Sequence, residues 1–301
     1  MLTGTGRLGA CLALLAVMVL VGCADTPPMD RTRPEIADFR IATYNVHYLD
    51  LTVEERDEWG LADWKARRDP LIRLVRAMDA DIVAFQEVET YGTSAPGRQV
   101  WLNWLRQASP QYQVASGQGT GAAVGQPIFF RPDKFVLLAD GHRFFNDPGG
   151  RFRSIRALAG YTDAVTWARF RHRASGRVIT VYNVHLHFLD TALRLRSSRE
   201  VLRLAQVARD RGDTVFVTGD FNARRNSRSL RMFYEAGFMR TEQQGASFHF
   251  NSGTHLFGAI DHMLHDRGTV PVGRSVTERR KVEGVWPSDH YPVWTDFKLV
   301  P

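Results

Sequence analysis

The sequence predicts one α/β domain with a β-sheet core. Short apolar runs typical of buried strands alternate along the chain with stretches whose apolar residues recur at the helical period. Several expected strands end in carboxylate, carboxamide or imidazole side chains, which indicates that their ends meet at one rim of the core. Hydrophobic residues make up 44% of the 301 positions, and no internal repeat divides the chain, so a single large domain is the simplest arrangement.

The clearest strand covers residues 215–222. Three β-branched or aromatic residues open it, Gly219 follows, and Asp220 and Asn222 stand two residues apart at its end. In an extended chain this spacing puts both side chains on one face. A carboxylate beside an amide on a strand end suits a hard cation or an ordered water molecule. The alternative is an ordinary turn, which glycine, aspartate and asparagine all favour.

Two strands and a helix are expected before residue 90. Residues 39–45 alternate as a strand that ends in Asn45, and residues 64–78 follow the helical period. Residues 82–85 then form a second buried strand, with Glu87 just past its end. A glutamate in this place is usually a solvated charge. Because Asn45 occupies an equivalent strand end, a site shared by the two residues is the alternative.

The middle of the chain predicts one helix and four strands, which cover residues 100–108 (the helix), 127–131, 135–140, 165–172 and 177–185. The last two strands form a hairpin. Its second strand ends in Asn183 and His185, which share a face. A single histidine at a strand end is more often structural than catalytic, but this pair repeats the spacing of Asp220 and Asn222.

The C-terminal part predicts two helices and two strands, in the order 195–208 (helix), 227–236 (helix), 257–264 and 293–299. Gly237 ends the second helix. Asp261 lies in the first of these strands, among apolar neighbours. Asp289 and His290 stand side by side in a turn bracketed by prolines, so one rigid turn brings a carboxylate and an imidazole to the same place.

The charge balance favours an anionic partner. The formal net charge is +7, and only four lysines are present, so the basic residues are almost all arginines. Guanidinium groups grip phosphate bidentately. Residues 145–160 carry Arg151, Arg153 and Arg156, which either are solvated or contact substrate phosphates. The glycine-rich stretch 116–125 lacks the Lys-Ser/Thr ending of a phosphate-binding loop.

Residues 1–22 are typical of a secretory signal peptide. A basic residue precedes an apolar run that is shorter than the ~20 residues a membrane-spanning helix needs. The run closes on Leu-Val-Gly-Cys at residues 20–23, which resembles the lipobox of bacterial lipoproteins. In such proteins the cysteine, here Cys23, is lipid-modified. The alternative is an uncleaved membrane anchor with an incidental cysteine.

The lipobox resemblance implies a domain order and a location. Residues 23–38 would tether a folded domain of residues 39–301 to the membrane through the lipid on Cys23. Ala24 follows the cysteine, which resembles an outer-membrane address, so the expected location is the bacterial cell envelope. Cys11 would leave with the signal peptide. A thiolate metal site or a cysteine nucleophile is then excluded, and any metal must be held by oxygen and nitrogen.

Nine polar candidates stand in these segments, namely Asn45, Glu87, Asn183, His185, Asp220, Asn222, Asp261, Asp289 and His290. Their order and surroundings resemble the endonuclease/exonuclease/phosphatase superfamily, the deoxyribonuclease-I-like fold. The matching stretches are Thr43-Tyr44-Asn45-Val46, Gln86-Glu87-Val88, Asn183-Val184-His185-Leu186, Gly219-Asp220-Phe221-Asn222, Ala259-Ile260-Asp261-His262 and Ser288-Asp289-His290-Tyr291-Pro292-Val293. The resemblance implies an α/β (α+β) four-layer sandwich, in which two packed, mixed and mainly antiparallel sheets are flanked by helices.

The same resemblance implies metal-dependent hydrolysis of a phosphoester. Glu87 would bind Mg²⁺ or Mn²⁺, assisted by Asn45 and Asp289, since hard cations prefer oxygen ligands. Asp220 and Asn222 would orient the attacking water and help to deprotonate it, or would help to hold a second metal ion.

The two histidines complete the implied site. His290 would contact the scissile phosphate or transfer a proton, with Asp261 orienting its ring. His185, supported by Asn183, would donate to a phosphate oxygen or to the leaving group. The expected function is a lipid-anchored, monomeric phosphodiesterase or nuclease whose partners are a phosphoester substrate, with nucleic acid as a candidate, and the membrane. One alternative is a hydrolase of phospholipid or sphingolipid head groups or of sugar phosphates; another is a catalytically silent binding module of the envelope.

Overall fold

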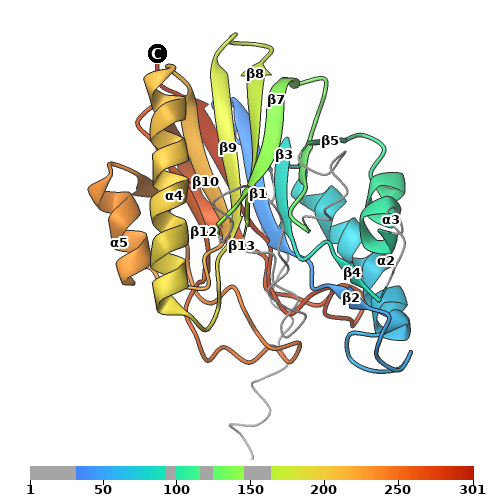
Figure 1. Ribbon diagram of the computed structural model, residues 1–301. Helices are drawn as coiled ribbons and strands as arrows, with labels where there is room; N and C mark the ends of the chain where they lie inside the picture. Colours follow the sequence, from blue (N-terminus) through green and yellow to red (C-terminus); the bar gives the residue numbers. More distant parts are fainter. Residues whose placement is uncertain (1–31, 93–98, 116–124, 146–163) are drawn as a thin grey trace, which may run out of the picture. The chain divides into compact units, whose positions relative to one another are not determined.

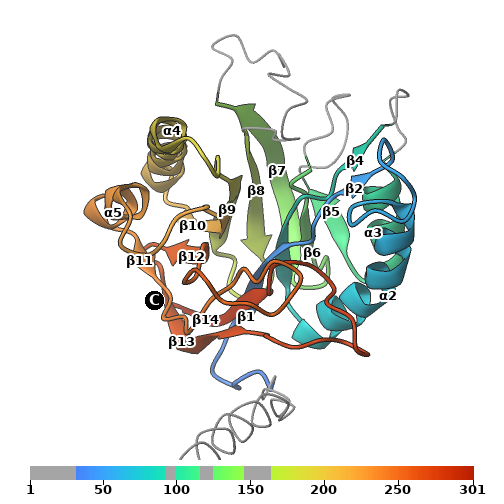
Figure 2. The same cartoon turned by 90° about the horizontal axis from the view of Figure 1, so that it is seen from below.

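Two six-stranded sheets pack face to face, with helices on the outer side of each (Figure 1, Figure 2). The computed structural model describes residues 32–92, 99–115, 125–145 and 164–301, all within the compact unit Arg31–Pro301. The predicted signal peptide, Cys23 and the first part of the tether lie outside the described residues. So do most of the glycine-rich stretch and the three arginines of the 145–160 loop.

Each sheet is mixed and mainly antiparallel, as predicted. The first has the order β13 (Thr269–Thr277), β14 (Val293–Leu299), β1 (Phe39–Asn45), β3 (Ile82–Gln86), β6 (Ile128–Phe130) and β5 (Gln113–Ala115). The second has the order β11 (Met239–Arg240), β12 (Asp261–His265), β10 (Thr214–Asp220), β9 (Val178–His185), β8 (Ala164–His172) and β7 (Phe135–Phe144). One central pair in each sheet is parallel, β1 with β3 and β10 with β9. A small separate pair joins β2 (Leu49–Asp50) to β4 (Thr90–Tyr91).

Among the described residues, four helices cover the outer faces of the sheets: α2 (Leu61–Met78) and α3 (Val100–Ala108) on the first, and α4 (Thr191–Asp210) and α5 (Arg228–Glu235) on the second. The helix α2 ends at Asp79, whose left-handed backbone (φ 49°) breaks it where the sequence predicts. The side chain of Asp190 caps α4 by accepting two backbone N–H groups. Within the described ranges, no helix combines the length and the apolar character needed to cross a bilayer.

The alternation of side chains along the central strands separates the cores and forms the rim. Along β1, Phe39 and Ile41 point into the core between the sheets, whereas Ala42 and Tyr44 face the layer under α2 and α3. Asn45 lies on the same face of β1 as Phe39 and Ile41, because alternate residues of a strand share a face. This inner face is therefore polar at its C-terminal end. The strands β3, β9 and β10 change from apolar to polar in the same direction. The polar end of the inter-sheet layer is therefore where the candidate residues lie.

Two C-terminal strands differ from the prediction. The strand expected over 257–264 begins only at Asp261, because the N–H groups of residues 260 and 261 donate to the side chain of Ser247. The sequence does not predict β13, since Pro271 and Gly273 interrupt its apolar pattern. β13 is an edge strand, where a proline is tolerated because its missing N–H leaves no central ladder partner unpaired. The short strands β5 and β11 and the β2/β4 pair were not predicted either.

Candidate active site

Four strand ends bring their polar side chains together between the two sheets. Asn45 Nδ2 donates to Glu87 Oε1 at 2.9 Å and to Asp220 Oδ2 at 3.3 Å. His185 Nε2 lies 3.7 Å from Glu87 Oε1 and 3.6 Å from Asp220 Oδ2. Asn45 ends β1 and Glu87 directly follows β3 in the first sheet, while His185 and Asp220 end β9 and β10 of the second. The cluster therefore joins the two sheets.

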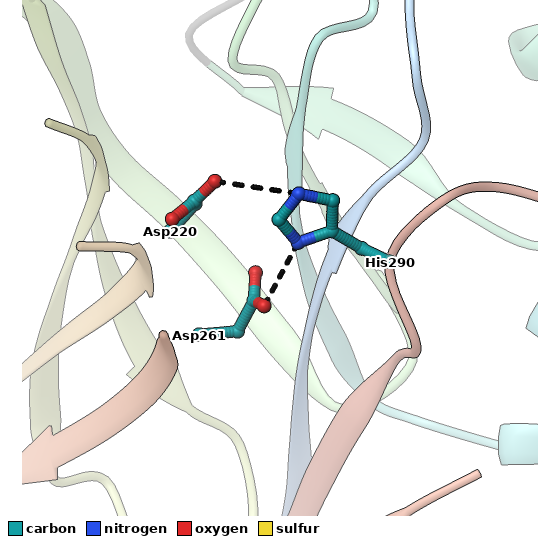
Figure 3. Close-up of side chains that lie close together, drawn as sticks. All are labelled: Asp220, Asp261 and His290. Carbon is teal, nitrogen blue, oxygen red and sulfur yellow. Dashed lines mark hydrogen bonds and ion pairs between the residues drawn. The ribbon is translucent and has the colours of Figure 1, made fainter. Parts of the chain in front are cut away.

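A second group shares Asp220 with the first (Figure 3). His290 Nδ1 lies 2.9 Å from Asp261 Oδ2, and His290 Nε2 lies 3.7 Å from Asp220 Oδ2. Asp220 and Asp261 are direct partners in the antiparallel pair of β10 and β12. All three side chains are buried. The imidazole of His290 thus lies between two carboxylates, with one at each ring nitrogen.

Asp289 adds a fourth carboxylate to the rim. Its Oδ1 lies 3.7 Å from His47 Nδ1 and 3.2 Å from the hydroxyl of Ser288. The same hydroxyl donates to the backbone carbonyl of Asn45 at 2.7 Å, which fixes the turn against β1. Burial, followed by the charge of Asp289, raises the pKa of Glu87. The two carboxylates therefore lie close enough to repel each other.

Asn183 and Asn222 support the strands that carry the site. Asn183 Nδ2 donates to the backbone carbonyl of Phe85 at 2.8 Å, and its Oδ1 accepts from Gln86 Nε2 at 2.7 Å. The backbone N–H of Asn222 donates to Asp220 Oδ1 at 2.7 Å, and its side-chain nitrogen donates to a carbonyl of the neighbouring loop. Both asparagines bond to backbone and amide groups, so they orient the cluster without adding a charged group to it.

The backbone turns sharply after three of these strands. His47, Glu87 and Asn222 have positive φ angles of 59°, 60° and 46°. Such angles are uncommon for residues other than glycine and concentrate at functional sites. They occur here because the backbone turns away from each strand while the polar side chains stay at the rim.

The environment gives the two site histidines opposite protonation states. Burial, followed by the charge of His290, lowers the pKa of His185 to about 3, so its ring is neutral at pH 7. Burial also disfavours a charged His290, but the carboxylates of Asp261, Asp220 and Asp289 outweigh it and raise the pKa of His290 well above its ordinary value. The result is one neutral and one protonated imidazole on either side of Asp220.

The rim crowds several acidic side chains into a buried space. Burial, followed by the charge of Asp261, raises the pKa of Asp220, as burial and Asp289 do for Glu87. Asp261 Oδ1 is buried with no hydrogen-bond partner. Carboxylate oxygens of Asp220 and Asp261 and a ring nitrogen of His290 all lie within 4.8 Å of one another. Crowded carboxylates with an unpartnered oxygen fit a hard divalent cation, which would neutralise them.

The amide of Asn45 is turned differently from what a metal ligand requires. Its Oδ1 accepts the backbone N–H of His47 at 3.1 Å, while its Nδ2 faces Glu87 and Asp220. In this orientation Asn45 positions the carboxylates by donating to them. Glu87 and Asp289 are then the members of the predicted metal set that present oxygen atoms.

Two serines matter to the site, although sequence reasoning gave them no role. Ser247 Oγ accepts the N–H groups of Ile260 and Asp261, both at 3.0 Å. No motif or periodicity marks Ser247, which lies in an irregular segment between β11 and β12. Ser288 directly precedes Asp289 and belongs to the stretch 288–293 that resembles the family. Its place in that stretch is the sequence signal that marks it.

Comparison with known proteins identifies a family whose chemistry fits the site geometry. The model of the endonuclease/exonuclease/phosphatase family matches residues 42–290. A subunit of the CCR4-Not complex of Candida albicans, described as the 3'-5'-exoribonuclease Ccr4, is 24% identical over 69% of this chain. The match spans 30% of that relative's length.

Solved structures show the fold at lower identity. An endonuclease/exonuclease/phosphatase family protein from Bacteroides thetaiotaomicron superposes with a TM-score of 0.70 at 19% identity, covering 86% of this chain and 97% of the other. The mannosyl-6-phosphatase of the same organism superposes with a TM-score of 0.66 at 19% identity, covering 86% and 99%. The family match includes every strand end described above, and the chain belongs to the endonuclease/exonuclease/phosphatase family, whose members are hydrolases of phosphoester bonds.

Proposed function

We propose that this protein is a divalent-metal-dependent phosphodiesterase whose main class of substrate is nucleic acid. The observation that carries the proposal is the approach of Asn45, His185 and His290 to the single carboxylate of Asp220. Asn45 and both histidines have nitrogen atoms within 3.7 Å of Asp220 Oδ2, in a buried rim between the sheets. Acidic oxygens beside imidazole donors are the groups that metal-assisted phosphoester hydrolysis needs.

The charge of the rim favours a diester over a monoester. A bound cation favours the ionised form of nearby carboxylates, so with the metal in place the carboxylates of Glu87, Asp220, Asp261 and Asp289 would face one protonated imidazole, that of His290. A single divalent cation leaves this set with residual negative charge. A phosphodiester carries one negative charge, whereas a phosphomonoester carries close to two at pH 7. The monoester would therefore meet the stronger repulsion.

We assign the metal to Glu87 and Asp289, with Asn45 holding the Glu87 carboxylate through its 2.9 Å hydrogen bond. Mg²⁺ and Mn²⁺ suit these oxygen donors, since both are hard cations. When bound, the ion would stabilise the negative charge that develops on the phosphoryl oxygens.

The histidines and Asp220 take the proton steps in this proposal. His290, held at Nδ1 by Asp261, presents a protonated Nε2 to a phosphoryl oxygen. Asp220 accepts the proton of the attacking water, and Asn222 fixes its other oxygen. His185 is neutral and donates to a phosphate oxygen or to the leaving group.

The test compares matched small substrates. The full-length protein should hydrolyse bis(p-nitrophenyl) phosphate with a kcat/KM at least about tenfold above that for p-nitrophenyl phosphate. A chelator should abolish the activity, and Mg²⁺ or Mn²⁺ should restore it. His290→Ala should lower kcat by about 10²–10⁴-fold, the range of general acid–base contributions. A panel of DNA, RNA, phospholipid and sugar phosphate then assigns the natural class.

The matched control is His142→Ala, on the β7 strand at the far edge of the second sheet. It should keep kcat within about twofold of the unchanged protein. Equal activity in His290→Ala and the unchanged protein would remove the proposed site. A preference for the monoester would instead retain the site and reject the diester assignment.

We propose further that the protein is exported and lipid-anchored to the cell envelope through Cys23. The support is the Leu-Val-Gly-Cys sequence that closes the apolar run. Cells labelled with radioactive palmitate should incorporate label into the protein, and Cys23→Ser should abolish both labelling and partition into detergent. Cys11→Ser is the matched control and should keep both. Label retained in Cys23→Ser would show that the lipid assignment is wrong.

A further inference from the structure

A pocket near the candidate active site is lined by arginines. It has a volume of about 670 Å³, and its walls include Arg224, Arg225, Arg240 and Arg279. No acidic residue lines it. Four guanidinium groups around one pocket make it strongly electropositive, so an anion is the ligand that its charge suits.

These arginines lack the carboxylate partners that other arginines of the described chain have. Arg40 is paired with Asp296 at 2.8 Å and Arg169 with Asp213 at 2.8 Å. Among the described residues, no carboxylate lies within 4.0 Å of the four pocket guanidinium groups. In the same pocket wall, Gln243 Nε2 is buried without a hydrogen-bond partner. The four guanidinium groups of the pocket are therefore not neutralised by any carboxylate of the described residues.

The chain itself links the pocket to the active site. Arg224 follows Asn222 by two residues, and Ala259 of the pocket wall precedes Asp261 by two. At 3.8 Å between successive Cα atoms, each pair lies within about 8 Å. The segment 241–250 also contributes to both places, because it carries Gln243 in the pocket and the serine that holds the Asp261 backbone.

Glycine makes room for one of the arginines. Gly245 has a φ of +73°, and a Cβ atom there would lie 2.1 Å from Arg279 Nη1. The guanidinium of Arg279 therefore packs directly against this backbone. The positive φ favours glycine at this position, and the missing side chain leaves the space that the Arg279 guanidinium occupies.

A run of aromatic rings leads from the catalytic histidine to the pocket. The ring of Phe248 lies 4.8 Å from that of His290, Phe250 lies 4.3 Å from Phe248, and Phe257 lies 5.7 Å from Phe250. The guanidinium of Arg224 then lies 5.5 Å from the ring of Phe257. Phe250 and Phe257 are each 41% exposed. Exposed phenylalanine rings beside cationic side chains are the surface on which bases of single strands stack.

We propose that the arginine pocket binds a second phosphate group of a single-stranded nucleic acid whose scissile phosphate lies at the Asp220–His290 site, with a base over Phe250 or Phe257. This inference rests on the proposed phosphodiesterase function and adds the substrate subsite to it. Planar guanidinium groups match the oxygens of a phosphate better than a point charge does. The aromatic rings between the two anion positions favour a nucleotide over a sugar phosphate, which has no ring system to stack.

Direct binding tests the subsite without turnover. Fluorescence anisotropy measures the affinity of the full-length protein for a 5'-fluorescein tetrathymidylate in the presence of a chelator. Arg240→Gln/Arg279→Gln should weaken binding by about tenfold or more. Loss of one phosphate contact should also lower the slope of log affinity against log salt concentration by about 0.7. Arg224→Gln/Arg225→Gln is a second pocket variant. Both of its arginines are exposed, so it tests the pocket even if the first variant misfolds.

The matched control removes the same charge elsewhere. Arg228 and Arg231 are exposed on α5, lie outside the pocket and have no carboxylate partner within 4.0 Å among the described residues. Arg228→Gln/Arg231→Gln should change the affinity by less than about threefold and leave the salt slope unchanged. Equal weakening in the pocket and control variants would overturn the subsite, because only the overall charge would then matter. No binding of the oligonucleotide by the unchanged protein would overturn it as well.

Failure of the subsite and failure of the proposed function give different results. If the small diester is hydrolysed but the pocket variants bind the oligonucleotide like the control, the subsite is wrong and the function stands. If the oligonucleotide binds through the pocket but no diester is cleaved, the function is wrong and the subsite stands. Vesicles that contain a phosphoinositide form the second arm. Tighter pocket-dependent binding to these vesicles than to the oligonucleotide would overturn the nucleic-acid assignment.

Discussion

Asn45 and Asp220 are 175 residues apart in sequence, and a 3.3 Å hydrogen bond from Nδ2 to Oδ2 joins them across the two sheets. Each residue ends a central strand of its own sheet. The same amide donates to Glu87 at 2.9 Å, so one asparagine holds a carboxylate of each sheet. The rim therefore depends on how the two sheets pack, and the predictions below test the groups that keep it in place.

Glu87→Gln should stabilise the metal-free protein and remove its activity. The neutral amide ends the repulsion with Asp289 that, after burial, raises the pKa of Glu87, so the free energy of unfolding should rise by about 1 kcal/mol. The kcat/KM for a phosphodiester should fall by about 100-fold or more, since the proposed metal ligand is lost. Urea unfolding in a chelator and steady-state kinetics measure the two effects.

The response to metal separates this role from a purely structural one. Mg²⁺ at about 100 times its Kd should stabilise the unchanged protein by about 2.7 kcal/mol, which raises the Tm by several degrees. Glu87→Gln should lose this shift, whereas Glu54→Gln, at an exposed position, should keep it. A metal-dependent Tm shift that survives in Glu87→Gln would place the cation elsewhere.

Ser247→Ala should destabilise the protein by about 2–4 kcal/mol. Its hydroxyl accepts two backbone N–H groups, which would be left buried and unpaired at about 1–3 kcal/mol each. The control is Ser109→Ala. The Ser109 hydroxyl is equally buried but has no hydrogen-bond partner, so its loss should cost less than about 1 kcal/mol. Urea unfolding of both variants gives the comparison, and similar costs would refute the capping role of Ser247.

Gly219→Ala should disrupt the parallel pair of β10 and β9. A Cβ atom at Gly219 would lie 2.0 Å from the carbonyl oxygen of Val184, and its φ of +139° is strained for any other residue. We expect a loss of about 3 kcal/mol or more in the free energy of unfolding, together with reduced activity, since Asp220 is the next residue. Gly212→Ala shares the positive φ (+82°) but meets no atom within 4 Å, so it should cost only about 1 kcal/mol. If thermal unfolding finds the two variants equally stable, the steric argument is wrong.

Stability below pH 4 should depend on Asp213. Burial raises its pKa, but hydrogen bonds from Arg169 and Thr180 outweigh burial and hold the pKa of Asp213 below its ordinary value of 3.8. The group binds a proton more readily when unfolded, so its stabilisation is fully present above about pH 3.8 and is lost as the pH falls through the lower folded-state pKa.

Asp213→Asn should therefore cost about 1–3 kcal/mol at pH 7, and the difference from the unchanged protein should shrink below pH 3.8. Urea unfolding at pH 7, 4.5 and 3 measures this. Asp133→Asn, at an exposed turn before β7, should show no comparable loss at any of these pH values. A difference that grows toward acid would contradict the sign of the argument.

Much of the fold could be predicted because its signals are local. Residues 39–45, 82–86 and 214–220 form strands where alternation and β-branched composition indicate them, and α2 ends at Asp79 as expected. The prediction was wrong where local signals mislead. β13 contains a proline that only an edge position tolerates, and the residues before Asp261 are held by a distant serine and form no strand.

The sequence by itself determined which chemical groups are present and at which strand ends they stand, since these depend on composition and on the period of two along a strand. The tertiary structure alone decided which of those groups meet. It turned the amide nitrogen of Asn45 toward two carboxylates, made His185 neutral and His290 protonated, and gathered four arginines around one pocket. Hydrogen-bond direction, protonation and local charge depend on burial and on neighbours far away in sequence, and these exist only once the sheets have packed.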